Sequence, residues 1–209
     1  MLDLLIGRRE LGKTTLAVHV ARFYKKRVIW DPRHMIHTSD IVVNDTTIDG
    51  LYDLLERYDE IIVRAHFDVN GTFERMCEEI QAWITEHPEI TFCLLLDEIR
   101  FTPKPDDETH FNWIVRCTPR DTVSVVVTAH GVPDINTNMR RIADYWILFQ
   151  LTLEADLQTV MERCGREVEK EVQKLKPYQF IVWNDGNRTW RKETNNERWR
   201  VSLKERKVA

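Results

Sequence analysis

Short apolar runs alternate along this chain with longer segments whose apolar residues recur at helical spacing. The runs predict β-strands and the longer segments predict α-helices. We expect strands at residues 2–6, 27–31, 61–64, 92–97, 123–128 and 145–151, and helices at 13–24, 47–58, 72–86, 109–117 and 153–174. Because the strands are apolar on both faces and alternate with helices, the pattern favours an α/β fold with a mainly parallel sheet between helices.

The C-terminal part has a different pattern. Runs at 178–183 and 189–192 flank the sequence Asn-Asp-Gly-Asn, and an Asp-Gly pair between two strand-like runs is typical of a tight turn. We therefore expect a C-terminal β-hairpin at about 178–193. The residues from 194 to 209 are polar and basic, and we expect them to form a tail.

Composition limits what kind of protein this is. A length of 209 residues suits one domain, which we place at residues 1–193. The net charge of −4 means that any contact with DNA must come from a local basic patch. No apolar stretch is long enough to span a membrane, and charged residues interrupt the N-terminus too early for a secretory signal. The four cysteines are scattered without a CxxC pair, which predicts reduced thiols, no zinc site and a cytoplasmic location.

A complete phosphate-binding loop follows the first expected strand. Residues Gly7 to Thr15 match the pattern G-x-x-x-x-G-K-[ST], and a segment with helical periodicity follows at once. The glycines let the backbone curl around phosphates, Lys13 supplies a positive charge, and the Thr14 hydroxyl is a ligand for the Mg²⁺ that a nucleotide carries. The sequence therefore predicts binding of ATP with Mg²⁺. The expected nucleotide contacts are Gly7, Arg8, Arg9, Glu10, Leu11, Gly12, Lys13, Thr14, Thr15 and Thr128.

An acidic pair ends the fourth expected strand. An apolar run, residues 92–96, leads into Asp97 and Glu98, which places both at the carboxyl end of a buried strand. There Asp97 can organise the metal, and Glu98 can polarise the water that attacks the terminal phosphate. Such pairs also occur as caps of the following turn. Beside a phosphate loop, the pair favours an ATPase over a kinase, whose attacking oxygen belongs to a second substrate.

Further candidate residues surround the fifth expected strand. Thr128 and His130 end it at the same sheet edge and are candidates to sense the terminal phosphate; the alternative is a satisfied strand end and an exposed turn. Arg120, and after it Arg116, are candidates for an arginine that stabilises the transferring phosphoryl group from a neighbouring protomer. Either arginine can instead be a surface charge.

Linked motifs resemble those of the FtsK–HerA superfamily of DNA-translocating ATPases. Residues 27–32, which read Arg-Val-Ile-Trp-Asp-Pro, are similar to the second-strand motif of that group, and residues 94–98 fit its Walker B strand. The segment from Arg120 to Phe149 has the family's order of an arginine, a strand, a polar sensor, a proline-containing turn and an Ala-Asp before the last core strand. The resemblance covers about residues 1–153. His130 stands where the family commonly has glutamine, so its charge depends on pH.

The resemblance implies a RecA-like P-loop NTPase core that assembles as a ring, usually a hexamer, and drives double-stranded DNA through its pore. Because the phosphate-loop strand starts at Leu2 without a preceding domain or membrane helix, the chain looks similar to the genome-packaging ATPases of membrane-containing icosahedral viruses. The resemblance then implies action in the host cytoplasm, association with the virion, and capsid or membrane-vertex proteins as partners.

The DNA-contacting segment is not fixed by the sequence. Eight lysines and arginines with two interleaved tryptophans lie between residues 188 and 207, which suits a nucleic-acid surface, although terminal charge runs are more often solvated tails. The segments His34–Asp40 and Phe67–Gly71 are alternative pore loops.

Three other functions are compatible with the same motifs. The chain can be a small nucleotide or metabolite kinase, an assembly ATPase of the filamentous-phage type, or a nucleotide-binding switch. A phosphorylated product would identify a kinase, and turnover that DNA leaves unchanged would identify a switch.

Overall fold

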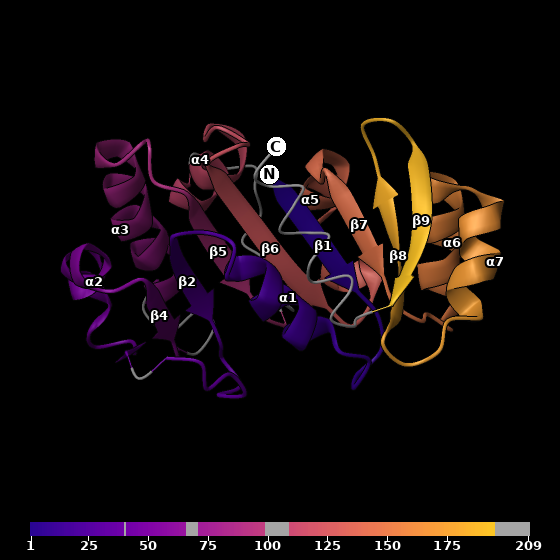
Figure 1. The fold of residues 1–209 in the computed structure, drawn as a ribbon, viewed down its shortest axis with the longest axis horizontal. Coiled ribbons are helices and arrows are strands. Elements are labelled where there is room, and N and C mark those ends of the chain that lie inside the picture. The colour runs from indigo at the N-terminus through magenta and orange to yellow at the C-terminus, as the bar shows by residue number, and fades with distance from the viewer. Residues whose placement is uncertain (40, 66–70, 99–108, 195–209) are drawn as a thin grey trace.

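The structure is a computed structural model that describes residues 1–39, 41–65, 71–98 and 109–194. These residues form a nine-stranded sheet in the order β3-β4-β2-β5-β6-β1-β7-β8-β9 (Figure 1). The strands from β3 to β7 pair in parallel, whereas β8 and β9 add an antiparallel edge. The expected α/β fold, with a mainly parallel sheet and a C-terminal hairpin, is confirmed.

The elements of the described residues follow one another in a βα alternation. The strands are β1 (Leu2–Ile6), β2 (Lys26–Trp30), β3 (Val42–Val43), β4 (Glu60–Val63), β5 (Phe92–Leu96), β6 (Val123–Ala129), β7 (Tyr145–Leu148), β8 (Gln179–Asn184) and β9 (Thr189–Thr194). The helices are α1 (Lys13–Ala21), α2 (Leu51–Arg57), α3 (Thr72–Glu86), α4 (His110–Arg116), α5 (Thr137–Ile142), α6 (Glu154–Cys164) and α7 (Arg166–Gln173), with 3₁₀ turns η1 (Ile48–Gly50) and η2 (Val132–Asp134).

The sheet is covered unequally on its two faces. One core cluster joins side chains of α2 to α7 to the alternate strand positions that include Leu4, Leu94 and Trp146. The other cluster joins α1 to the positions between them, such as Leu5 and Leu95. Figure 1 shows α1 crossing one face of the sheet at its middle. The carboxyl edge of the central strands is therefore framed by the phosphate loop and the start of α1.

Three expected elements differ from the structure. The helix expected at 153–174 is two helices, because Gly165 adopts φ 93° and separates α6 from α7. The strand expected at 145–151 ends at Leu148, because its partner strand β1 ends at Ile6, the residue paired with Leu148, where the chain turns into the phosphate loop. The helix expected at 13–24 ends at Ala21.

Other elements were not predicted from the sequence at all. Strand β3 has two residues, too few for a periodic pattern. Helix α5 buries only Met139, so its sequence lacks an apolar stripe. Among the residues that the structure describes, none of the helices combines the length and apolar character needed to cross a bilayer.

The turn into the phosphate loop depends on a close backbone approach. Gly7 follows β1, and its N–H donates to Ala129 O at 3.2 Å. A Cβ atom at Gly7 would lie 2.5 Å from the Cβ of the fully buried Phe149. The backbone of Phe149 is fixed in turn by a 2.8 Å hydrogen bond to Ile6 O. Glycine at position 7 is thus required by packing as well as by the turn.

We expect Gly7→Ala to lower the free energy of unfolding by about 1–3 kcal/mol, because the added methyl group forces the loop away from Phe149. Urea denaturation measures this change. Gly50→Ala is the matched control, since a Cβ at Gly50 would meet no atom of the described residues within 4 Å, and its stability should stay near that of the parent chain. Equal stability of the two variants would contradict the packing argument.

Candidate functional site

Three neighbouring strands bring the sequence-predicted residues to one edge of the sheet. In the order β5-β6-β1, Asp97 and Glu98 follow the first strand, Thr128 lies near the end of the second, and Lys13 follows the third through the phosphate loop. Because all three strands are parallel, their carboxyl ends meet at the same edge. This is where open α/β sheets bind their ligands.

Among the described residues, no side chain caps the N-terminus of α1, which follows the phosphate loop. Gly12 occupies the N-cap position with φ 91° and Glu10 has φ 61°, so the loop curls through two left-handed residues. Leu11 anchors the loop by packing into the core cluster beside α1, whereas Arg8 and Arg9 are exposed. Uncapped amide groups at a helix N-terminus attract anions. The loop is therefore shaped to receive phosphate.

Lys13 is buried at the base of this loop. Its Nζ donates to Arg8 O at 2.7 Å, and the residue is 5% exposed. Burial lowers the pKa of the Lys13 ammonium to about 8, although the nearby carboxylates of Glu98 and Asp97 partly oppose that shift. A negatively charged ligand in the loop would raise this pKa again.

Asp97 is held by two hydroxyl groups. Thr14 Oγ1 donates to Asp97 Oδ1 at 2.9 Å, and Thr128 Oγ1 donates to the same oxygen at 2.7 Å. Burial raises the pKa of the Asp97 carboxyl, and these two hydrogen bonds oppose the shift. The hydroxyl of Thr128 is thus engaged with the acidic pair, and its contact with a nucleotide stays a prediction.

Glu98 has an unusual backbone and a charged partner. Its φ is 51°, and its N–H donates to Thr128 Oγ1 at 2.7 Å. Non-glycine residues with positive φ often lie at functional sites, where the surroundings hold the strain. The Glu98 carboxylate forms an ion pair with Arg33, and His130 Nε2 lies 3.0 Å from its other oxygen.

His130 is in the position expected for the end of β6. Burial lowers the pKa of its imidazole, with the charge of Glu98 opposing that shift, and Arg9 Nε donates to His130 Nε2 at 3.4 Å. The imidazole can act as a charged partner of Glu98 only when it is protonated, whereas the Arg33 guanidinium is always charged. Arg33 is therefore the charged partner that balances Glu98.

Arg33 is a functional candidate that the sequence analysis missed. It lies in the turn after β2, where the buried carboxylate of Asp31 accepts hydrogen bonds from Met35 N at 3.0 Å and Ile36 N at 2.9 Å. This capped turn directs Arg33 toward Glu98. The sequence shows an arginine directly after the Asp-Pro pair at 31–32, but nothing in the sequence indicates that this turn lies next to β5. Only the fold brings the two together.

These groups line a cleft of about 420 Å³. Its walls combine the phosphate loop, the acidic pair and the turn after β2; the lining residues are Arg9, Glu10, Gly12, Lys13, Thr14, Thr15, Arg33, Met35, Asp97 and Glu98. A second cavity, of about 310 Å³, shares Thr14, Thr15 and Met35 with it and extends along α1 to Arg22. Six of the nine predicted loop residues therefore line the cleft, whereas Gly7, Arg8 and Leu11 do not.

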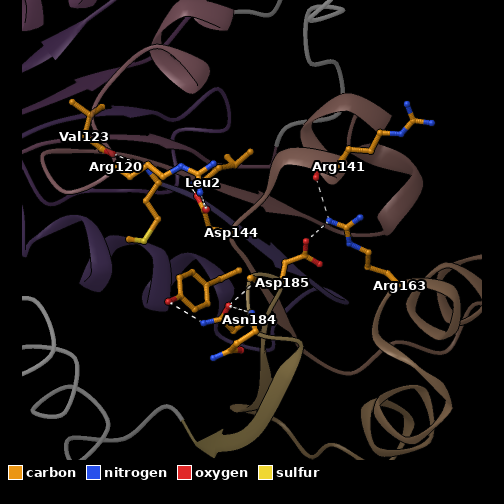
Figure 2. Close-up of polar contacts among 12 residues, drawn as sticks. Leu2, Arg120, Val123, Arg141, Asp144, Arg163, Asn184 and Asp185 are labelled. Atoms are coloured by element: carbon orange, nitrogen blue, oxygen red, sulfur yellow. Dashed lines mark hydrogen bonds and ion pairs between the residues drawn. The ribbon is translucent and has the colours of Figure 1, made fainter.

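The two candidate arginines lie at the opposite edge of the sheet. Arg120 forms an ion pair with Asp144, whose other oxygen accepts from Leu2 N at 2.8 Å at the start of β1 (Figure 2). Arg116 ends α4 before the amino end of β6 and is exposed. The length of β1, about 15 Å, separates this edge from the phosphate loop. Neither arginine reaches the cleft of its own chain.

The segments considered for DNA contact are only partly described. Residues 195–209, Asp40 and 67–70 lie outside the described residues. In the hairpin, Arg191 pairs with Glu193 at 2.8 Å and Lys192 lies 3.8 Å from Glu171. The contact of these segments with DNA stays a prediction.

Comparison with known proteins gives structural matches alone. No family model matches the sequence, and no curated protein matches it either. The genome-packaging NTPase B204 of Sulfolobus turreted icosahedral virus 2, in complex with sulfate, is similar with a TM-score of 0.74 and 16% identity, over 92% of this chain and 95% of that one. Its complex with AMPPCP matches with a TM-score of 0.74 and 18% identity, over 92% and 96%.

Two further structures agree with this likeness. The DNA-packaging ATPase B204 from Sulfolobus turreted icosahedral virus matches with a TM-score of 0.74 and 16% identity, over 94% of this chain and 98% of that one. EssC (ATPases 2 and 3) from Geobacillus thermodenitrificans matches with a TM-score of 0.51 and 9% identity, over 99% and 42%. The chain thus has the P-loop NTPase fold of the viral genome-packaging NTPase B204, as the resemblance to the FtsK–HerA superfamily implied.

Proposed function

We propose that this chain is an ATP-hydrolysing motor that moves double-stranded DNA and packages a viral genome as a ring of identical copies. The observation that carries the proposal is the cleft in which Lys13, Asp97 and Glu98 meet at the carboxyl edge of three neighbouring strands. The fold supports the same reading, because B204 is described as a genome-packaging NTPase and has been determined in complex with ATP-gammaS and AMPPCP.

The nucleotide occupies the cleft with its phosphates in the loop. Lys13 faces them as a point charge, and the uncapped start of α1 adds its amide groups. The neighbouring cavity along α1 gives the rest of the nucleotide a place to extend, because the two cavities share Thr14, Thr15 and Met35.

The residues present fit a magnesium ion that accompanies the nucleotide. Thr14 and Asp97 supply a hydroxyl and a carboxylate, the hard oxygen ligands that Mg²⁺ takes, and their oxygens lie 2.9 Å apart in the cleft. These two residues would hold the ion together with phosphate oxygens. When bound, Mg²⁺ neutralises charge that develops on the phosphates during their cleavage.

Glu98 orients the attacking water. Its carboxylate ends β5 beside the cleft, and Arg33 holds it through an ion pair. A terminal phosphate in the cleft competes with Glu98 for the Arg33 guanidinium, and this competition frees the carboxylate to accept a proton from water. Arg33 then supplies positive charge to the transferring group from within the same chain.

The remaining parts of the site come from neighbouring copies. Arg120, and after it Arg116, lie at the amino edge of the sheet and can act only on the nucleotide of another protomer. A hexameric ring provides that arrangement and a pore for DNA. We place the motor in the host cytoplasm and at the virion, with capsid or membrane-vertex proteins as its docking partners.

Steady-state ATPase assays with and without duplex DNA, combined with native mass measurement, test the motor. We expect duplex DNA to stimulate release of inorganic phosphate from an assembled ring, without a phosphorylated acceptor. Glu98→Gln should bind ATP while turnover falls by about 10²–10⁴, because the general base is lost. Glu89→Gln, the same change at an exposed position, is the control. Turnover that ignores both DNA and assembly would instead identify a switch.

Lys13 makes nucleotide affinity depend on pH. Its pKa of about 8 in the free chain is raised by bound phosphate, so binding takes up a proton when the pH exceeds 8. We expect the affinity for an ATP analogue to be constant below about pH 7 and to weaken above pH 8, by at most about tenfold per pH unit. Fluorescence titration measures this profile. Lys13→Arg stays charged throughout, so a profile as steep as that of the parent chain would assign the proton to another group.

Arg33 has a separable role in turnover. We expect Arg33→Ala to lower kcat by roughly tenfold or more while the Kd for ADP stays unchanged, because the lost charge acts on the terminal phosphate that ADP lacks. Arg33→Lys should recover part of the rate. An unchanged kcat in Arg33→Ala would contradict this role and would leave Arg33 with only the ion pair to Glu98.

A further inference from the structure

The turn after β2 carries two residues of the proposed nucleotide site. Arg33 forms an ion pair with Glu98, and Met35 borders both the cleft and the cavity along α1. The side chain of Arg33 is long and 35% exposed, so the place of its guanidinium group depends on the backbone that carries it. Contacts that fix this turn therefore also fix the positive charge beside Glu98.

The carboxylate of Asp31 holds two amide groups of the turn. Asp31 is fully buried, and its two oxygens accept one hydrogen bond each, from Met35 N and Ile36 N. The N–H of Asp31 donates to Val63 O at 2.9 Å, which continues the pairing of β2 with β4 beyond the last residue of β2. The start of the turn is thus fixed to the sheet, but these bonds do not involve the carbonyl oxygen of Ile36.

Arg64 holds this carbonyl oxygen from the neighbouring strand. It directly follows β4, and its own N–H donates to Val43 O at 2.8 Å at the end of β3. The Nη2 of Arg64 donates to Ile36 O at 2.9 Å and lies 3.2 Å from His37 Nδ1, while its Nε lies 3.9 Å from the Asp31 carboxylate. One guanidinium group therefore contacts both ends of the turn.

Arg64 also places a positive charge beside a buried carboxylate. The side chain of Asp31 has no exposed surface, and an ionised carboxylate at such a position is stabilised by a nearby cation. The turn itself contains Arg33, two residues along the chain from Asp31, but the guanidinium group of Arg33 is paired with Glu98. Arg64 thus meets the charge of Asp31 and leaves Arg33 for the acidic pair.

We propose that Arg64 is a positioning residue of the nucleotide site, which holds the turn after β2 so that Arg33 faces Glu98 and the terminal phosphate. This inference rests on the proposed function, because it concerns the same cleft. Arg64 is not among the described residues that line the cleft or the cavity along α1, so its effect passes through the turn. Its loss frees Ile36 O and leaves Asp31 buried without this cation, and both changes let the turn shift.

The affinities of the full chain for ATP-gammaS and for ADP test this role without turnover. ADP lacks the terminal phosphate that Arg33 faces, so Arg64→Ala should weaken binding of ATP-gammaS roughly fivefold or more and leave the Kd for ADP unchanged. Arg57→Ala removes an exposed arginine of α2 and is the matched control, which should change neither Kd. An unchanged Kd for ATP-gammaS in Arg64→Ala would overturn the proposal, and so would an equal loss of affinity for both nucleotides.

A double-mutant cycle with Arg33 separates positioning from a direct effect. If Arg64 acts through Arg33, Arg64→Ala should weaken ATP-gammaS binding by less than about twofold in an Arg33→Ala chain, because that turn has no guanidinium group left to place. A loss of the same size in both backgrounds would contradict the positioning role. Arg64→Lys keeps a positive charge near Asp31 and should show an intermediate loss; it replaces Arg64→Ala in both tests if that variant does not fold.

The proposed motor and the role of Arg64 fail separately. A chain that binds both nucleotides and releases no phosphate would refute the motor, while a selective loss of ATP-gammaS binding in Arg64→Ala would still support positioning. A DNA-stimulated ATPase in which Arg64→Ala binds ATP-gammaS normally would uphold the motor and refute the role of Arg64. A chain that binds neither nucleotide would refute both.

Discussion

One carboxylate oxygen of Asp97 accepts hydrogen bonds from the hydroxyls of Thr14 and Thr128, and this shared acceptor joins the ends of three neighbouring strands. Thr14 follows β1 through the phosphate loop, Thr128 lies near the end of β6, and Asp97 follows β5. Thr128 also accepts from Glu98 N, so the same hydroxyl fixes the backbone of the second acidic residue. The relative positions of the loop and the acidic pair therefore depend on this small buried network.

Burial in the cleft opposes the charged forms of the ionisable groups in and around this network. Burial lowers the pKa of Lys13 and raises that of Asp97, so burial in the cleft disfavours the ionised form of each group. A phosphate with its metal ion would reverse both effects, since it places a negative group beside the lysine and a positive ion beside the carboxylate.

Predictability from sequence followed the strength of the local signal. The buried strands and α3 were predicted closely, because apolar runs and an apolar stripe are large signals that tertiary contacts rarely override. Gly165 broke an expected helix because it adopts a backbone conformation that the surrounding helical periodicity conceals. Helix α5 was missed since its single buried residue, Met139, leaves no pattern to detect. The end of β7 was placed too late because its partner β1 ends at Ile6, opposite Leu148, and the local apolar pattern does not show where a partner strand ends.

The sequence by itself determined the phosphate loop, the acidic pair and the parallel α/β arrangement, because each depends on residue types at fixed local spacing. Only the tertiary structure decided that Arg33 pairs with Glu98 and that the Thr128 hydroxyl forms hydrogen bonds to both residues of the acidic pair. It also decided that Arg120 lies at the opposite sheet edge, and that Arg64 contacts the turn that carries Arg33. These contacts join residues far apart in the chain, and their distances are set by strand order and register, which local patterns do not encode.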